Sequence, residues 1–378
     1  MRLNVPPIPY RNDVGGGALP AVHAVLQALG AQVRYEELLV LSGAAFTFVY
    51  DNAPVYEPQR DLTPADTLML AAQASGYTGR WVVDRPAAEA VREIAAALAA
   101  GRPAIVSIYD DEGRHGFSVV VDCREGYLTL QGENPVEVPW PEHWWGAVTG
   151  PGAWGACPVF LTEPGAIPAW SPDGRLHRAL HRAVSLMSGG WAPYRDCDGS
   201  RMYSRVPLAG RRAAFGLPAY DLLLADVGGA ETAGAFSLLW RLDAQLSQLQ
   251  HGRTAAAAFL RTLAHPVAQV AEDTCAEGAA LAGDLMSRFW YRPTRSLSTT
   301  ADVLSAVACE SALVFWLQLP DDELARLSQR MPVTQTPWGP IAVMDTIPRR
   351  REAAALVERL KQSHVQVSRQ IAELRDAL

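Results

Sequence analysis

Apolar residues in the first 165 positions follow a helical period at first and a strand period later. Leu19, Val22, Leu26 and Leu29 recur at three- and four-residue spacing and predict a helix over 18–30, which Gly30 ends. Similar signals predict helices at 35–41, 63–76 and 86–100. Alternating or β-rich runs predict strands at 46–50, 80–84, 103–109, 116–122 and 127–131. Because helices come first and the later strands are joined by short turns, we expect an α+β domain with an antiparallel sheet.

The second half of the chain has a different pattern. The stretch 132–175 is dense in Pro, Gly and Trp, which is typical of a domain boundary. Helical periodicity then dominates, and the only clear strand signal lies at 340–344. The predicted helices are 175–188, 218–227, 232–250, 254–290, 300–318 and 349–378. The sequence therefore predicts two domains, an α+β domain over 1–165 and an all-α domain over 175–378.

The last predicted helix carries a single apolar stripe. Its members share spacings of three, four or seven residues: Leu356, Leu360, Val367, Ile371, Leu374 and Leu378. Such a stripe packs a helix on its own domain, or it joins two chains in a coiled coil. A homodimer through the C-terminal helices therefore stays open.

Composition and charge exclude several classes of function. The formal net charge of −7 argues against nucleic acid as a partner and against a polybasic contact with a membrane. Lys361 is the only lysine, so no lysine Schiff base or phosphate-binding lysine is available elsewhere. No signal peptide and no run of about 18 apolar residues is present, so we expect no membrane span.

The sequence pattern also contains no metal-binding motif and no cysteine spacing typical of a disulfide framework. The five cysteines are scattered and contain no CxxC pair, which favours a reducing cytoplasm over disulfides or a zinc site. His177 and His181 have the i, i+4 spacing of two ligands, but no third ligand accompanies them. We therefore expect neither a metal nor a cofactor.

His115 is the most informative single position. It stands directly before the apolar strand 116–122, and Asn134 follows the next predicted strand. Two adjacent antiparallel strands would bring these residues to one end of the sheet. A histidine with an asparagine partner is the base and its orienting group in nucleophilic catalysis. The alternative is a loop histidine and an Asn-Pro turn, and spacing alone favours that alternative.

Four segments, in this order, resemble a known bacterial family. They are Gly17-Ala18-Leu19 with its helix to Gly30, the run Leu39 to Phe46, the strand His115 to Asp122, and Asn134-Pro135. The chain resembles the butirosin biosynthesis protein H family, whose N-terminal domain is similar to papain-like leader peptidases. The resemblance implies a papain-like fold for 1–165 and a helical C-terminal domain. It also implies transfer of an acyl group from a carrier protein to an amine, with His115 and Asn134 in the site.

The catalytic cysteine of that family is replaced here. Its place falls at Gly17, preceded by Gly15 and Gly16, and the upstream segment contains Tyr10 and Asn12 in place of the usual glutamine. Without a thiolate, ordinary cysteine peptidase chemistry is not expected.

Three interpretations stay open. In the first, His115 is a base for acyl transfer or amide chemistry on a small-molecule or carrier-bound substrate, and Gly17 offers a backbone oxyanion donor. In the second, a non-catalytic cleft binds a peptide, a carrier protein or a metabolite. In the third, the protein is a helical assembly module. The residues expected to line the site and bind the ligand are Gly15, Gly16, Tyr10, Asn12 and Phe46.

Overall fold

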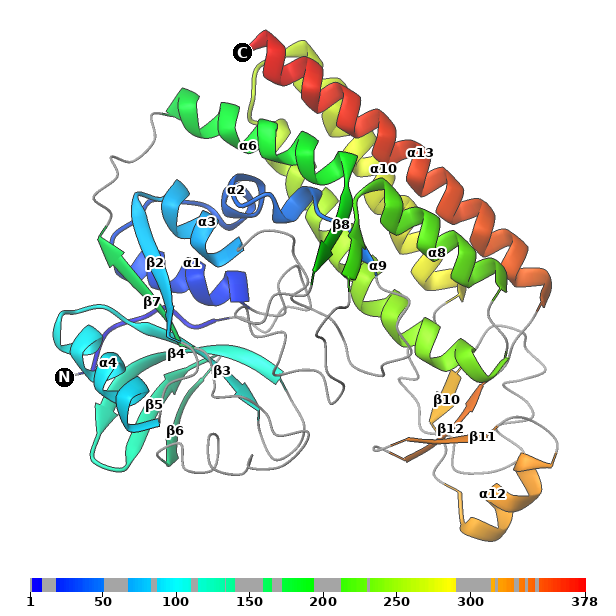
Figure 1. The fold of residues 1–378 in the computed structure, drawn as a ribbon, viewed down its shortest axis with the longest axis horizontal. Helices are drawn as coiled ribbons and strands as arrows, with labels where there is room; N and C mark the ends of the chain where they lie inside the picture. Colours follow the sequence, from blue (N-terminus) through cyan, green and yellow to red (C-terminus); the bar gives the residue numbers. More distant parts are fainter. Residues whose placement is uncertain are drawn as a thin grey trace.

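The computed structural model describes the chain in segments. These are residues 2–8, 18–50, 67–82, 87–109, 115–132, 134–139, 159–164, 172–193, 212–229, 232–289, 314–316, 319–329, 333–336, 339–343 and 347–378. Helices and antiparallel sheets are both present (Figure 1), so the predicted α+β class is confirmed.

A six-stranded antiparallel sheet forms the centre of the N-terminal half. Its strand order is β2-β7-β3-β4-β5-β6. The bounds are β2 Tyr77–Val82, β3 Ala104–Tyr109, β4 His115–Arg124, β5 Tyr127–Gln131, β6 Pro135–Pro139 and β7 Val159–Pro164. The predicted hairpin between β4 and β5 is confirmed, with Arg124 paired to Tyr127. Strands far apart in the sequence also pair, since β7 lies between β2 and β3.

Helices cover both faces of this sheet. On one face, α1 (Ala18–Ala28), α2 (Tyr35–Leu41) and α3 (Thr67–Ala74) share a core with Phe117 and Val119 of β4. On the other face, α4 (Ala87–Ala99) packs on Val120 and Leu128. The stop signal at the end of α1 is confirmed, because Gly30 has a φ of 88° and the Ala31 N–H donates to the Leu26 carbonyl.

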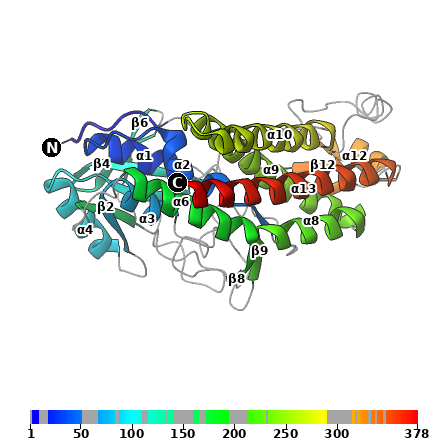
Figure 2. The ribbon, with the colours of Figure 1, turned by 90° about the horizontal axis from the view of Figure 1, so that it is seen from above.

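Long helices dominate the C-terminal half. Their bounds are α6 Pro172–Ser188, α8 Leu217–Gly229, α9 Thr232–Leu260, α10 Pro266–Phe289, α12 Asp321–Ser328 and α13 Ile347–Ala377. Helices α10 and α13 lie side by side (Figures 1 and 2). The predicted boundary between the helices 232–250 and 254–290 is wrong, because α9 continues to Leu260. Pro266 is the first residue of the next helix, where its missing N–H costs nothing.

The prediction of an all-α C-terminal domain is wrong. Two three-stranded antiparallel sheets contain strands of this half, with orders β1-β9-β8 and β10-β12-β11. The bounds are β1 Val49–Tyr50, β8 Gly190–Pro193, β9 Arg212–Phe215, β10 Val314–Trp316, β11 Val333–Thr336 and β12 Gly339–Val343. Strand β10 lies inside the range predicted as a helix over 300–318. A short apolar run does not distinguish a buried strand from a buried helix.

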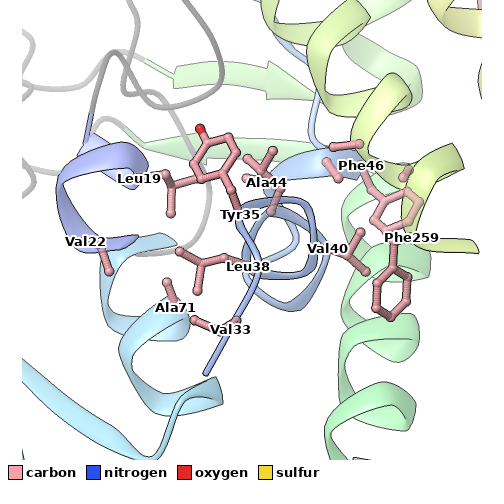
Figure 3. Packing of buried hydrophobic residues seen from close by; sticks show 14 of the residues in the cluster. Leu19, Val22, Val33, Tyr35, Leu38, Val40, Ala44, Phe46, Ala71 and Phe259 are labelled. Carbon is pink, nitrogen blue, oxygen red and sulfur yellow. The ribbon is translucent and has the colours of Figure 1, made fainter. Parts of the chain in front are cut away.

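The two halves share their main core (Figure 3). One continuous cluster contains Leu38 and Phe46 from the N-terminal half together with Phe259 and Val367 from the C-terminal half. The expected strand over 46–50 is shortened to β1, and residues Ala44–Phe46 form a 3-10 helix, η1. Since β1 pairs with β9, a sheet also crosses the predicted boundary. The division at 165–175 stays a prediction.

The apolar stripe of α13 is used within the chain. Leu356, Leu360, Val367, Ile371 and Leu374 are buried, whereas Leu378 is exposed. The helix packs on α6, α8 and α10 of the same chain, as expected if the helix belongs to its own domain. A homodimer stays a prediction, and this stripe does not supply a free surface for it.

Candidate functional site

Strand β4 fixes the backbone of His115. His115 is the first residue of the strand, and its Cα partner is Tyr109, the last residue of β3. Further along, Phe117 and Val119 are buried against the α1 face, which anchors the strand. The side chain of His115 lies outside the described part of the structure. The expectation that His115 opens an anchored strand is confirmed for the backbone.

Asn134 lies in the turn between β5 and β6, and its side chain is exposed. Gln131 at the end of β5 pairs with Val119 on one side and with Pro135 on the other. Strand β4 runs antiparallel to β5. His115 therefore lies four residues from Val119, toward the end of the sheet at which β5 enters this turn. At the rise of a strand, four residues span about 13 Å. Neighbouring strands therefore carry His115 and the Asn134 turn to the same end of the sheet.

The N-terminal segment, residues 2–8, is hydrogen-bonded to this sheet. The Leu3 N–H donates to the Val121 carbonyl and the Ile8 N–H to the Gly132 carbonyl, both at 2.8 Å. Val5 and Ile8 are 5% and 6% exposed and belong to the main core. This segment was not predicted from the sequence. Its signal is the presence of apolar residues next to prolines, which is typical of an extended segment on a core.

The other residues predicted for the site have different outcomes. Tyr10, Asn12, Gly15, Gly16 and Gly17 lie outside the described residues, which resume at Ala18 with α1. Phe46 has no exposed surface. Its ring lies 5.8 Å from the guanidinium carbon of Arg253. The structure thus gives Phe46 a place in the core rather than on a ligand-binding surface.

Neither described cysteine has the environment of a nucleophile. Burial, and then the neighbouring Asp122 carboxylate, raise the pKa of Cys123 in β4. Burial raises the pKa of Cys275 in α10 to about 11. Both thiols are therefore protonated at neutral pH, which is the unreactive form. Cys157, Cys197 and Cys309 lie outside the described residues.

Within the described ranges, no group of three His, Cys, Asp or Glu side chains is placed to hold a metal ion. His177 and His181 are both exposed on α6, as expected for a solvated helix face. None of the described helices is long and apolar enough to span a membrane.

A buried polar cluster joins four helices in the C-terminal half. A terminal nitrogen of the Arg253 guanidinium in α9 lies 2.6 Å from Nδ1 of His364 in α13, and the Tyr220 hydroxyl in α8 lies 3.3 Å from the same Nδ1. A guanidinium can only donate, so Nδ1 accepts, and Nε2–H donates to the Met187 carbonyl of α6 at 3.0 Å. His364 is 1% exposed and Arg253 is 2% exposed. This geometry requires a neutral imidazole.

The pKa values agree with the geometry of the cluster. Burial, and then the Arg253 charge, lower the pKa of His364 to about 3. This buried histidine was not predicted from the sequence, although the sequence contains a signal for it. His364 lies four residues after Leu360 and three residues before Val367, which is the spacing of the apolar stripe of α13.

Comparison with protein-family models and with curated proteins finds no match to this chain.

Proposed function

We propose that this protein transfers acyl groups in small-molecule biosynthesis, with a papain-like site that works without a cysteine nucleophile. The observation that supports the proposal is that the backbone of His115 and the Asn134 turn lie at the same end of the antiparallel sheet. Helix α1 packs on the same sheet, and Gly17 directly precedes it in the sequence. A helix that packs on such a sheet, with a histidine at a strand start, supports the resemblance to the butirosin protein H family.

The reaction needs a general base and an oxyanion donor. The amine nitrogen of the acceptor attacks the carbonyl carbon of a thioester, so that a C–N bond forms and the C–S bond breaks. His115 accepts the proton of the attacking amine and returns it to the departing thiolate, while Asn134 orients the imidazole. Backbone N–H groups of Gly15, Gly16 and Gly17, before the first turn of α1, would hold the oxyanion. No covalent enzyme intermediate is required.

The substrate in this proposal is an acyl group on a carrier protein or a small thiol, and the acceptor is an amine of a small molecule. No metal or cofactor is required by this chemistry. We place the reaction in the cytoplasm, because the scattered cysteines favour a reducing compartment.

A non-catalytic binding protein is the second candidate. One observation favours it: before Ser42 the chain contains no Cys, Ser or Thr, so no side-chain nucleophile lies near α1 in the sequence. Both described cysteines have raised pKa values. In this candidate the same end of the sheet binds a peptide, a carrier protein or a metabolite without chemistry.

The test uses acyl thioesters of N-acetylcysteamine with an aminoglycoside as the amine acceptor, and mass spectrometry detects the amide product. We expect His115→Ala to reduce the rate by about 10²–10⁴-fold, the range for loss of a general base. His177→Ala is the matched control, because His177 is an exposed histidine on α6. Equal rates for the two variants would exclude His115 as the base. Binding of a carrier or peptide that survives His115→Ala, with no amide formed, would favour the second candidate.

A further inference from the structure

We propose that the N-terminal segment, residues 2–8, positions the Asn134 turn of the candidate site through the backbone N–H of Ile8. The inference rests on the proposed function. It assigns to Ile8 a positioning role, because Ile8 acts on the site through the turn and not by touching the substrate.

Two anchors hold the segment across neighbouring strands. The Leu3 N–H donates to the Val121 carbonyl in β4, and the Ile8 N–H donates to the Gly132 carbonyl directly after β5. Between them, Val5 lies in the main core with only 5% exposure. The two backbone hydrogen bonds and the burial of Val5 and Ile8 both stabilise the segment in this position. The segment is therefore firmly bound on the sheet.

The Gly132 carbonyl is the point at which the segment acts on the site. It accepts from the Ile8 N–H at 2.8 Å and from Nε2 of Gln131 at 3.2 Å. A carbonyl oxygen has two lone pairs, so both donors can be satisfied together. Asn134 follows two residues later, and its carbonyl oxygen lies 3.8 Å from the place that a Cβ on Gly132 would occupy. A shift of the Gly132 peptide thus moves the turn that carries Asn134.

In the sequence, Ile8 also shortly precedes the other residues proposed for the site. After Ile8 the chain continues to Tyr10, Asn12 and the three glycines before α1. One hydrogen bond thus ties the start of this stretch to the turn of Asn134. A displacement of about 1 Å in a catalytic group can cost about 10²-fold in rate. The Ile8 N–H is therefore expected to matter more for catalysis than for stability.

The test compares variants that separate the N–H from the side chain. Ile8→Pro removes the N–H and the isoleucine side chain, whereas Ile8→Ala removes the side chain and keeps the N–H. Leu3→Pro removes the other anchor, at the end of the segment farther from the turn. The readouts are kcat and KM for the thioester reaction, the NMR signals of the Asn134 amide groups, and the NMR titration of the His115 imidazole.

We expect Ile8→Pro to lower kcat at least tenfold relative to Ile8→Ala, with KM within threefold, and to shift the Asn134 amide signals. Leu3→Pro is expected to leave kcat within threefold of the parent protein. Equal kcat and unshifted Asn134 signals in Ile8→Pro and Ile8→Ala would overturn the inference. If the parent protein forms no amide, the proposed function fails. The NMR signals of Asn134 and the titration of His115 then still decide whether Ile8 positions the turn.

Discussion

We expect mild acid to destabilise this protein through His364. Its imidazole is buried between the Arg253 guanidinium, the Tyr220 hydroxyl and the Met187 carbonyl, and this geometry accepts only the neutral form. The perturbation is a change from pH 7 to pH 5, made on the parent protein and on His364→Gln. The variant keeps an amide that can hydrogen bond but removes the titrating group.

The magnitude follows from the difference in proton affinity between the folded and unfolded chain. The pKa of His364 is about 3 in the folded protein, against 6.5 for the ordinary imidazole. Because the folded pKa is lowered, the unfolded chain takes up the proton first, and stability falls as pH decreases from about 6.5 toward 3. At pH 5 the unfolded imidazole is about 97% protonated while the folded one stays neutral. Relative to pH 7 this costs about 2 kcal/mol of unfolding free energy.

Tyr220 of the cluster and Cys275, which also interacts with Arg253, do not contribute in this window. Burial raises the pKa of Tyr220 to about 12 and that of Cys275 to about 11, so both stay protonated between pH 5 and pH 7. Groups outside this cluster are identical in the parent protein and in His364→Gln. The difference between the two proteins therefore isolates His364.

The assay is urea unfolding, followed by circular dichroism, at pH 7 and at pH 5 for both proteins. The parent protein is expected to lose about 2 kcal/mol more than His364→Gln between these two pH values. An equal loss in the two proteins would refute the reasoning. It would mean that the imidazole takes up a proton in the folded state, which the contact with Arg253 forbids.

Two further predictions concern the backbone and one hydrogen bond. Gly189→Ala is expected to lower the unfolding free energy by at least about 2 kcal/mol more than Gly101→Ala. Both residues have positive φ, but only a Cβ at Gly189 would collide with the Phe215 carbonyl oxygen. Thermal unfolding measures the difference, and equal losses would contradict it. Tyr50→Phe is expected to cost about 1–3 kcal/mol in urea unfolding, since its hydroxyl donates to Oδ2 of Asp226 at 2.7 Å. A loss under about 0.5 kcal/mol would contradict a stabilising role for this bond.

Most elements of the N-terminal half could be predicted because each has a local signal, whereas β6 and β7 lie in the stretch 132–175, for which no strand was predicted. Residues 18–30 combine a helical period with a terminal glycine, and α1 forms there. The strands β3, β4 and β5 are rich in β-branched, aromatic or other apolar residues, and a tight turn joins β4 and β5. Local periodicity reflects which side of an element meets a core, and it does not depend on the identity of the neighbour.

The C-terminal half was harder to predict because its strands are short. Strand β10 has three residues, and β1 has two. A run of this length shows no period, and its conformation depends on the strand that pairs with it. Val49 pairs with Phe215 from the other half of the chain. No local pattern in the sequence carries that information.

The candidate site could be predicted only in part for the same reason. The positions of His115 before a strand and of Asn134 after the next one follow from the sequence, as does the adjacency of two strands joined by a short turn. The anchoring of Ile8 to the Gly132 carbonyl does not follow, because it joins residues far apart in the chain through a backbone contact. Such a contact has no side-chain signature.

The last helix, α13, shows what the sequence determines and what only the tertiary structure determines. The sequence by itself determined that α13 forms and that one stripe of it faces a core, and its four- and three-residue spacings to Leu360 and Val367 place His364 on that stripe. Only the tertiary structure decided that Arg253, 111 residues away, lies against this histidine. The period of a helix fixes which residues are buried, but the packing of whole helices fixes which buried groups meet. That meeting determines the pKa of His364 and the response of this protein to acid.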